Sequence, residues 1–107
     1  YCYSMESVLH PAVKLAEDRL RLHVRDLLPE ARVWLFGSRA AKRARRRSDF
    51  DLAVELNAGT PDTALDAFEE VVAADPEIIY SVDVLDLRTA TATLRKAVAS
   101  EGILWTS

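Results

Sequence analysis

The sequence predicts an α+β domain of the two-layer α/β kind, in which a small mixed β-sheet has helices packed on it. The first observation is that segments with helical spacing of apolar residues alternate with at least three strand-like segments. The second is that 107 residues, half of them apolar and 29% charged, suit one modest hydrophobic core. We therefore expect one domain.

A first amphipathic helix is predicted over residues 11–28, where apolar residues recur at helical spacing between charged ones. Pro11 suits the first turn, and Pro29 ends the helix. The continuous apolar run over residues 32–36 then predicts a buried strand that leads the chain to Gly37. This helix and this strand are the first two elements of the expected two-layer domain.

A second strand is predicted over residues 49–56 from strict alternation of apolar and polar side chains. Phe50 and Leu52 belong to its apolar face, and Asp49 and Asp51 share the other face. Turn residues follow, with Thr60 as the expected cap of a second helix that ends before Pro76.

A third strand is predicted over residues 78–87, with Asp83 on the same face as Leu85. Thr89 or Thr91 is expected to cap a last helix that closes near Gly102. The apolar residues 103–105 then form a short tail.

Positive charge is concentrated in one loop. The net charge is -3, yet residues 39–47 hold six of the fourteen basic side chains. Such a local feature favours binding of a specific anionic ligand or partner over general, non-specific binding of nucleic acid. The alternatives are an acidic partner surface, RNA, or a solvated loop. Arg39, next to Gly37, is the expected phosphate contact.

Cys2 is the only cysteine, which excludes an intrachain disulfide and a cysteine-based metal site and favours the reducing cytoplasm. No apolar run approaches the roughly 20 residues of a membrane span. His10 and His23 lie without other ligand types at metal spacing, so we expect structural or surface roles for both.

Asp49 and Asp51 are predicted to project to the same side of a strand, about 7 Å apart at the backbone. Like charges this close repel unless a cation neutralises them, and Mg²⁺ prefers carboxylate oxygens. Asp83 is expected to be buried on a neighbouring strand and to complete the site, because a buried lone carboxylate would be costly. The alternative is that the pair faces solvent or binds the preceding arginines.

Gly37 and Ser38 end a predicted strand, and backbone N–H groups at such a turn can hold phosphate oxygens. A phosphate cradle followed by paired carboxylates suits nucleotidyl transfer, in which an acceptor attacks the α-phosphorus of a magnesium-bound nucleoside triphosphate. Two Mg²⁺ ions could act in such a displacement. Asp83 could also assist deprotonation of the acceptor.

The sequence resembles the DNA polymerase beta-like nucleotidyltransferase superfamily, specifically its minimal nucleotidyltransferase (MNT) branch. The likeness runs from about Arg32 to Leu87 and consists of "GSRA", a ten-residue gap, "SDFDLAV" and "VDVLDL". Ala41 and Lys42 stand where many relatives have an Arg-Gly pair, which affects the loop and not the carboxylates. Asp86 is a rival to Asp83, but alternation places it on the opposite strand face.

The resemblance implies a nucleotidyltransferase fold and a single minimal domain over residues 6–107. Because residues 1–4 precede Met5, residues 1–5 are expected to be a disordered N-terminus or a remnant of expression. The resemblance also implies ATP as substrate and Mg²⁺ as cofactor. Nucleotide contacts are expected from Gly37, Ser38, Arg39 and Ser48. Metal ligation and catalysis are expected from Asp49, Asp51 and Asp83.

The resemblance further implies an antitoxin that transfers AMP to a tyrosine of a HEPN ribonuclease toxin encoded by the adjacent gene, with a possible hetero-oligomer. Size favours a macromolecular acceptor, because little chain remains to build a second wall around a small one. The alternatives are a non-catalytic antitoxin that acts by binding alone, and an RNA-binding accessory protein.

Overall fold

The computed structural model describes residues 11–37 and 49–106 of the 107-residue chain. The expected N-terminal segment 1–5, His10, and the basic loop with Ser38, Arg39 and Ser48 lie outside these residues, as does Ser107. The described part contains three helices: α2 (Pro11–Leu27), α3 (Thr63–Ala74) and α4 (Ala92–Glu101).

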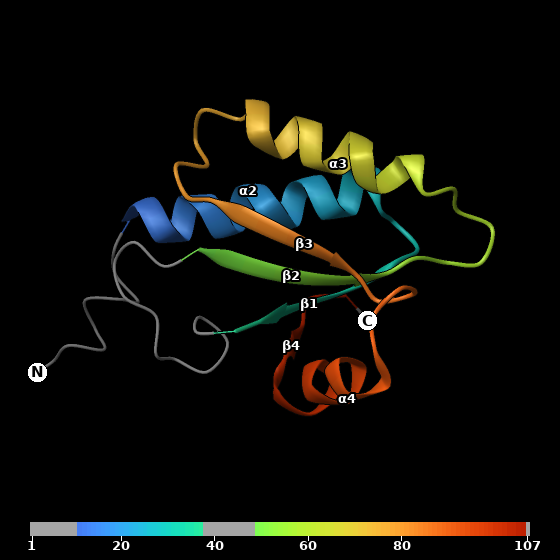
Figure 1. The fold of residues 1–107 in the computed structure, drawn as a ribbon. Coiled ribbons are helices and arrows are strands. Elements are labelled where there is room, and N and C mark those ends of the chain that lie inside the picture. The colour runs from blue at the N-terminus through green and yellow to red at the C-terminus, as the bar shows by residue number, and fades with distance from the viewer. Residues whose placement is uncertain (1–10, 38–48, 107) are drawn as a thin grey trace, which may run out of the picture.

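Four strands form one mixed sheet in the order β3-β2-β1-β4. The strands are β1 (Arg32–Phe36), β2 (Phe50–Glu55), β3 (Val82–Asp86) and β4 (Ile103–Leu104). β1 is antiparallel to both β2 and β4, whereas β2 and β3 are parallel. Figure 1 shows α2 and α3 on one side of the sheet and α4 on the other. The predicted sheet with helices packed on it is confirmed.

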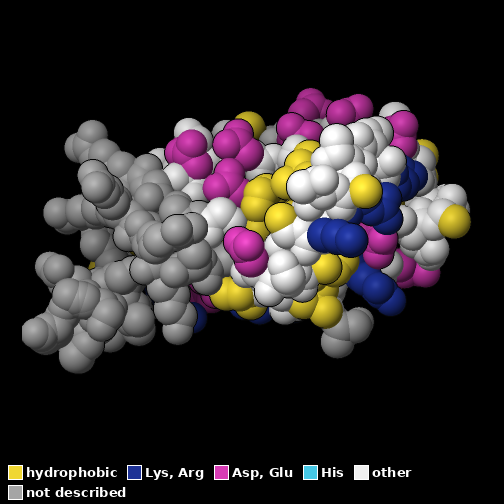
Figure 2. Space-filling view, turned by 60° about the horizontal axis from the view of Figure 1, so that its bottom comes forward, with side chains coloured by type: hydrophobic (Ala, Val, Ile, Leu, Met, Phe, Trp, Pro, Cys, Tyr) yellow, Lys and Arg dark blue, Asp and Glu magenta, His cyan; other side chains and the backbone are white. Residues whose placement is uncertain are grey.

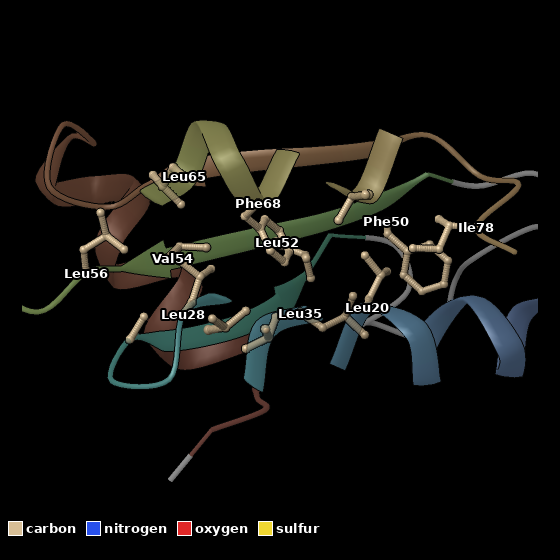
Figure 3. Packing of buried hydrophobic residues seen from close by; sticks show 14 of the residues in the cluster. Leu20, Leu28, Leu35, Phe50, Leu52, Val54, Leu56, Leu65, Phe68 and Ile78 are labelled. Atoms are coloured by element: carbon tan, nitrogen blue, oxygen red, sulfur yellow. The ribbon is translucent and has the colours of Figure 1, made fainter. Parts of the chain in front are cut away.

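The larger hydrophobic core lies between the sheet and the helices α2 and α3 (Figure 3). Phe50, Leu52 and Phe68 are fully buried there, together with Leu20 from α2. Alternate residues of β1 divide between the two faces, so that Val33 enters this core and its neighbours do not. This layer gives the sheet the rigid support that a site at its end requires.

A smaller core on the other face joins the sheet to α4. Ala53 is completely buried there and packs with Leu87 and Val98, flanked by Trp34 and Phe36. By strict alternation along residues 49–56, Ala53 shares the polar face with Asp49 and Asp51. It is buried because α4 covers this part of the sheet, which the two-residue alternation of the strand alone does not reveal.

Several element boundaries differ from the predictions. Thr60 does not cap α3, because its N–H donates to Asn57 O in the preceding turn and the helix begins at Thr63 after Asp62. The third strand begins at Val82, and Ile78 instead turns into the core. Residues 103–104, predicted as a tail, pair with β1 as an edge strand.

The other helix ends agree with the sequence. Pro11 opens α2, and the helix ends two residues before Pro29. Of the two proposed caps for α4, Thr91 is the correct one, because its side-chain oxygen accepts a hydrogen bond from Leu94 N at 3.2 Å. Thr89 instead donates from its hydroxyl to Asp86 O.

The carboxylate of Asp75 links the two helices of the larger layer. One of its oxygens lies 2.8 Å from Arg19 Nε and 2.7 Å from His23 Nε2, both on α2. Its other oxygen accepts a hydrogen bond from Glu77 N at 2.9 Å. Asp75 follows α3 directly, so this cluster fixes the end of α3 against α2. The structural role expected for His23 is confirmed.

Within residues 11–37 and 49–106, no helix is both long and apolar enough to cross a bilayer.

Candidate functional site

The predicted carboxylates lie at one end of the sheet, where β1 ends and where β2 and β3 begin. In Figure 1 this end lies next to the grey trace. The register pairs Phe36 with Asp51 and Asp51 with Asp83. Residues that are paired across neighbouring strands point to the same face. Phe36, Asp51 and Asp83 therefore form one row across the sheet, which we call the carboxylate row.

Asp51 is the half-buried centre of the carboxylate row. Its pKa is raised above the ordinary value, first by burial, then by the negative charges of Asp83 and Asp49, and also by hydrogen bonding with the Asp83 side chain. Three acidic side chains therefore influence one another at this end of the sheet. No cation of the described residues offsets this repulsion, and under such a condition a bound cation would be most favourable.

Gly37 lies directly against this group. Its φ of 76° falls in the left-handed region that glycine tolerates best. A Cβ atom built at Gly37 would lie 2.4 Å from Asp51 Oδ2, which is much closer than atoms can approach. The missing side chain thus lets the turn after β1 pack against the Asp51 carboxylate. The sequence predicts that Gly37 contacts phosphate, and the structure adds this contact with Asp51.

Two of the predicted carboxylates are more exposed than expected. Asp83 was predicted to be buried, but it is exposed, because β3 is an outer strand with no described strand beyond it. Asp49 is also exposed, since β2 begins one residue later. Both side chains therefore face solvent from which a ligand can approach.

Asp86, the rival of Asp83, is paired with Val54 of β2, whose side chain belongs to the larger core. It thus lies on the opposite face from the carboxylate row. Its carboxylate accepts a hydrogen bond from Arg88 N at 2.9 Å and lies 3.4 Å from Arg88 Nε. The preference for Asp83 over Asp86 agrees with this geometry.

The donor chemistry of these residues fits a hard divalent cation. Carboxylate oxygens are the ligands that Mg²⁺ prefers, and no cation of the described residues offsets the negative charges around Asp51. Across residues 11–37 and 49–106, no three acidic, histidine or cysteine side chains are already gathered tightly enough for a metal site. Asp49, Asp51 and Asp83 are the residues that could hold such an ion.

Figure 2 shows acidic side chains gathered where the described part of the chain meets the grey atoms, with hydrophobic side chains beside them. The expected nucleotide contacts Ser38, Arg39 and Ser48 fall in the grey region and stay predictions. Phe36 was not singled out from the sequence. Its place in the carboxylate row follows only from the pairing of β1 with β2.

Known proteins resemble this chain in sequence and in fold. Residues 30–107 match the family described as polymerase beta, nucleotidyltransferase. The probable protein adenylyltransferase MntA of Haemophilus influenzae is 31% identical over 75 residues, which are 70% of this chain. The matched region spans 65% of that relative's length.

Solved structures show the same fold. One chain of a toxin-antitoxin complex with AMP-PNP matches 83% of this chain and 71% of its own length, with a TM-score of 0.65 and 27% identity. One chain of a complex between tri-AMPylated Shewanella oneidensis HEPN toxin and MNT antitoxin matches 86% of this chain and 70% of its own length. Its TM-score is 0.62 and its identity 26%.

The family match covers most of the chain, and the matched residues include β1, β2 and β3 with the whole carboxylate row. The "GSRA" and "SDFDLAV" segments that carried the sequence resemblance lie within the same region. This chain belongs to the polymerase beta nucleotidyltransferase family.

Proposed function

We propose that this protein is a magnesium-dependent adenylyltransferase that acts as an antitoxin. It transfers AMP from ATP to a tyrosine hydroxyl of a partner HEPN ribonuclease toxin, in the cytoplasm where both are made. The observation that carries the proposal is the carboxylate row, in which Asp51 and Asp83 lie side by side beneath the Gly37 turn. The relatives named above, an adenylyltransferase and antitoxins in complex with HEPN toxins, support it.

In this reaction the tyrosine oxygen attacks the α-phosphorus of ATP. A new O–P bond forms, the bond from the α-phosphorus to the bridging oxygen breaks, and pyrophosphate leaves. A bound Mg²⁺ ion would neutralise negative charge on the triphosphate. Asp49, Asp51 and Asp83 would hold it, as a set of oxygen ligands.

The exposed carboxylate of Asp83 has a second task in this proposal. It accepts the proton that the tyrosine hydroxyl loses, and then releases that proton to solvent. The half-buried Asp51 can lie against the turn after β1, because Gly37 has no Cβ to occupy the space of its carboxylate. Gly37, Ser38, Arg39 and Ser48 would contact the phosphates.

The proposal is tested by incubating the protein with ATP, Mg²⁺ and the HEPN-family protein encoded beside it, and then weighing the intact partner. We expect a mass increase by one or more AMP units that disappears when ATP or Mg²⁺ is omitted. A partner that binds but never gains AMP would refute the proposal that this protein is an adenylyltransferase.

The same experiment separates the alternatives. Neutralisation that persists in an Asp49→Asn, Asp51→Asn double variant, or without ATP, would identify an antitoxin that acts by binding alone. An RNA-binding accessory protein would instead show RNA affinity that falls steeply with salt concentration.

A further inference from the structure

Among the described residues, no strand pairs with the outer edge of β3. β3 is the last strand of the sheet, and no described strand or helix covers its outer side (Figure 1). All five of its residues are at least partly exposed, whereas four of the six residues of β2 are buried. The segment "VDVLD" contains neither Lys nor Pro, which are common protections of an edge strand.

The bonds at the two ends of β3 show which backbone groups face outward. Phe50 N donates to Ser81 O at 2.9 Å, and Leu87 N donates to Val54 O at 2.9 Å. In a parallel pair, alternate residues of a strand direct both backbone groups to the neighbour. The odd-numbered residues from Ser81 to Leu87 therefore face β2, and Val82, Val84 and Asp86 face outward.

Most of these outward groups are open for pairing. Asp86 O already accepts hydrogen bonds from Thr89 N and from the Thr89 hydroxyl. Five outward groups remain available for pairing: the N–H and C=O of Val82, the N–H and C=O of Val84, and the N–H of Asp86. Within residues 11–37 and 49–106 none of these five groups has a hydrogen-bond partner outside the ladder. They form a template long enough for a short extended peptide.

The carboxylate row ends at this edge. Strands in a sheet lie about 4.8 Å apart, so a peptide paired with β3 would place one residue directly beside Asp83. Its side chain would point to the same face as Asp51 and Asp83, because paired residues share a face. A hydroxyl on that residue would enter the carboxylate row at the position where an acceptor is needed.

We propose that the acceptor protein binds by adding an extended segment, which carries its tyrosine, as a fifth strand on the open edge of β3. This inference rests on the proposed adenylyl transfer and specifies how the acceptor is held. Main-chain pairing of this kind gives affinity without demanding a fixed sequence around the acceptor residue.

The opposite edge of the sheet is a poorer template. β4 has only two residues, Ile103 and Leu104, and no acidic row reaches it. Its exposed side chains lie on the far side of β1 from Asp51 and Asp83. A strand added there could not present a hydroxyl to the carboxylate row.

The test uses proline at an outward position. Val84→Pro removes an outward N–H while leaving the ladder to β2 intact, and proline is tolerated on such an edge. Val84→Ala is the matched control, because it shortens the same side chain and keeps the N–H. Thermal unfolding and binding of ATP with Mg²⁺ verify that both variants are folded. We expect transfer to the partner to fall roughly tenfold or more in Val84→Pro relative to Val84→Ala.

A second measurement uses the wild-type protein with the HEPN-family partner. Amide hydrogen exchange of Val82, Val84 and Asp86 should slow in the complex, and exchange of Asp83 and Leu85 should change little because they already pair with β2. If Val84→Pro transfers AMP as fast as Val84→Ala, strand addition is wrong and the transfer function stands. If the wild type transfers no AMP, the proposed transfer function is wrong. Amide exchange then still tests the binding edge: slower exchange at Val82, Val84 and Asp86 would support binding along β3, and unchanged exchange would overturn it.

Discussion

Asp51 and Asp75 are two acidic residues in opposite electrostatic surroundings. The pKa of Asp75 is lowered to about 2, first by the His23 hydrogen bond, then by the backbone N–H of Glu77 and by Arg19. The pKa of Asp51 is raised, because burial and its acidic neighbours both disfavour the charged form. Asp75 has cationic partners and stabilises the packing of α2 on α3, whereas among the described residues Asp51 is influenced only by acidic neighbours.

The difference indicates where function resides. A carboxylate that is fully paired with donors contributes to the folded state and has no capacity left for a ligand. A carboxylate that repels its neighbours costs folding free energy and gains most from an added cation. The same residue type thus stabilises the fold in one region and, in the function proposed above, binds a ligand in the other. The predictions below test this division.

Removing the central carboxylate should have the largest effect. Asp51→Asn and Asp83→Asn are expected to lower the rate of AMP transfer at least about a hundredfold, because each removes an oxygen ligand and its charge. The measurement is the initial rate of partner modification by intact mass. Asp86→Asn is the matched control from the opposite face and should keep most of the rate.

The Asp51→Asn variant should not lose stability. The raised pKa of Asp51 means that its stabilising contribution is complete below the unfolded pKa and is lost as the pH rises through the folded pKa. At neutral pH the charged side chain therefore opposes folding, and the amide does not. A clear decrease in the urea midpoint would show that Asp51 is a structural residue after all.

Asp75→Asn should show the reverse behaviour. The change removes charge from a carboxylate with 4% side-chain exposure, and it leaves His23 and Arg19 with a poorer acceptor. We expect the free energy of unfolding to fall by about 2 kcal/mol. Urea unfolding measures the loss, and the exposed Glu69→Gln on α3 is the control. Transfer activity of the folded fraction should persist.

Gly37→Ala should disturb the carboxylate row with a smaller cost to the fold. The new Cβ would collide with Asp51 Oδ2, and φ at 76° disfavours alanine by roughly 1 kcal/mol. We expect about a tenfold loss of transfer rate, since Asp51 must move aside. Gly59→Ala is the control, because nothing lies within 4 Å of its added Cβ. Equal rates in both variants would contradict the contact.

Acid should weaken the Asp75 cluster gradually. A carboxylate with a lowered pKa contributes stability above its unfolded pKa and loses it as the pH falls toward the folded value. The free energy of unfolding should therefore decrease between about pH 4 and pH 2. In Asp75→Asn this part of the decrease should be absent. Denaturant titrations at several pH values would measure the difference between the two proteins.

Several features of the fold could be predicted from the sequence because local chemistry decides them. Pro11 and Pro29 bound α2, and the alternation after Asp49 indicated β2 and its neighbouring carboxylates. Thr60 was misassigned as a cap, because the turn from Asn57 competes for its backbone. The short β4 was missed, since two residues carry no periodic pattern.

The amino-acid sequence by itself determined the candidate residues of the proposed site and their strand faces, because the types and the spacing of Gly37, Asp49, Asp51 and Asp83 are local properties of the chain. Only the tertiary structure decided how they meet. The parallel register sets Asp51 beside Asp83, the left-handed turn brings Gly37 onto Asp51, and the edge position of β3 exposes Asp83. Pairing between strands is a contact between distant segments, so no local pattern specifies it.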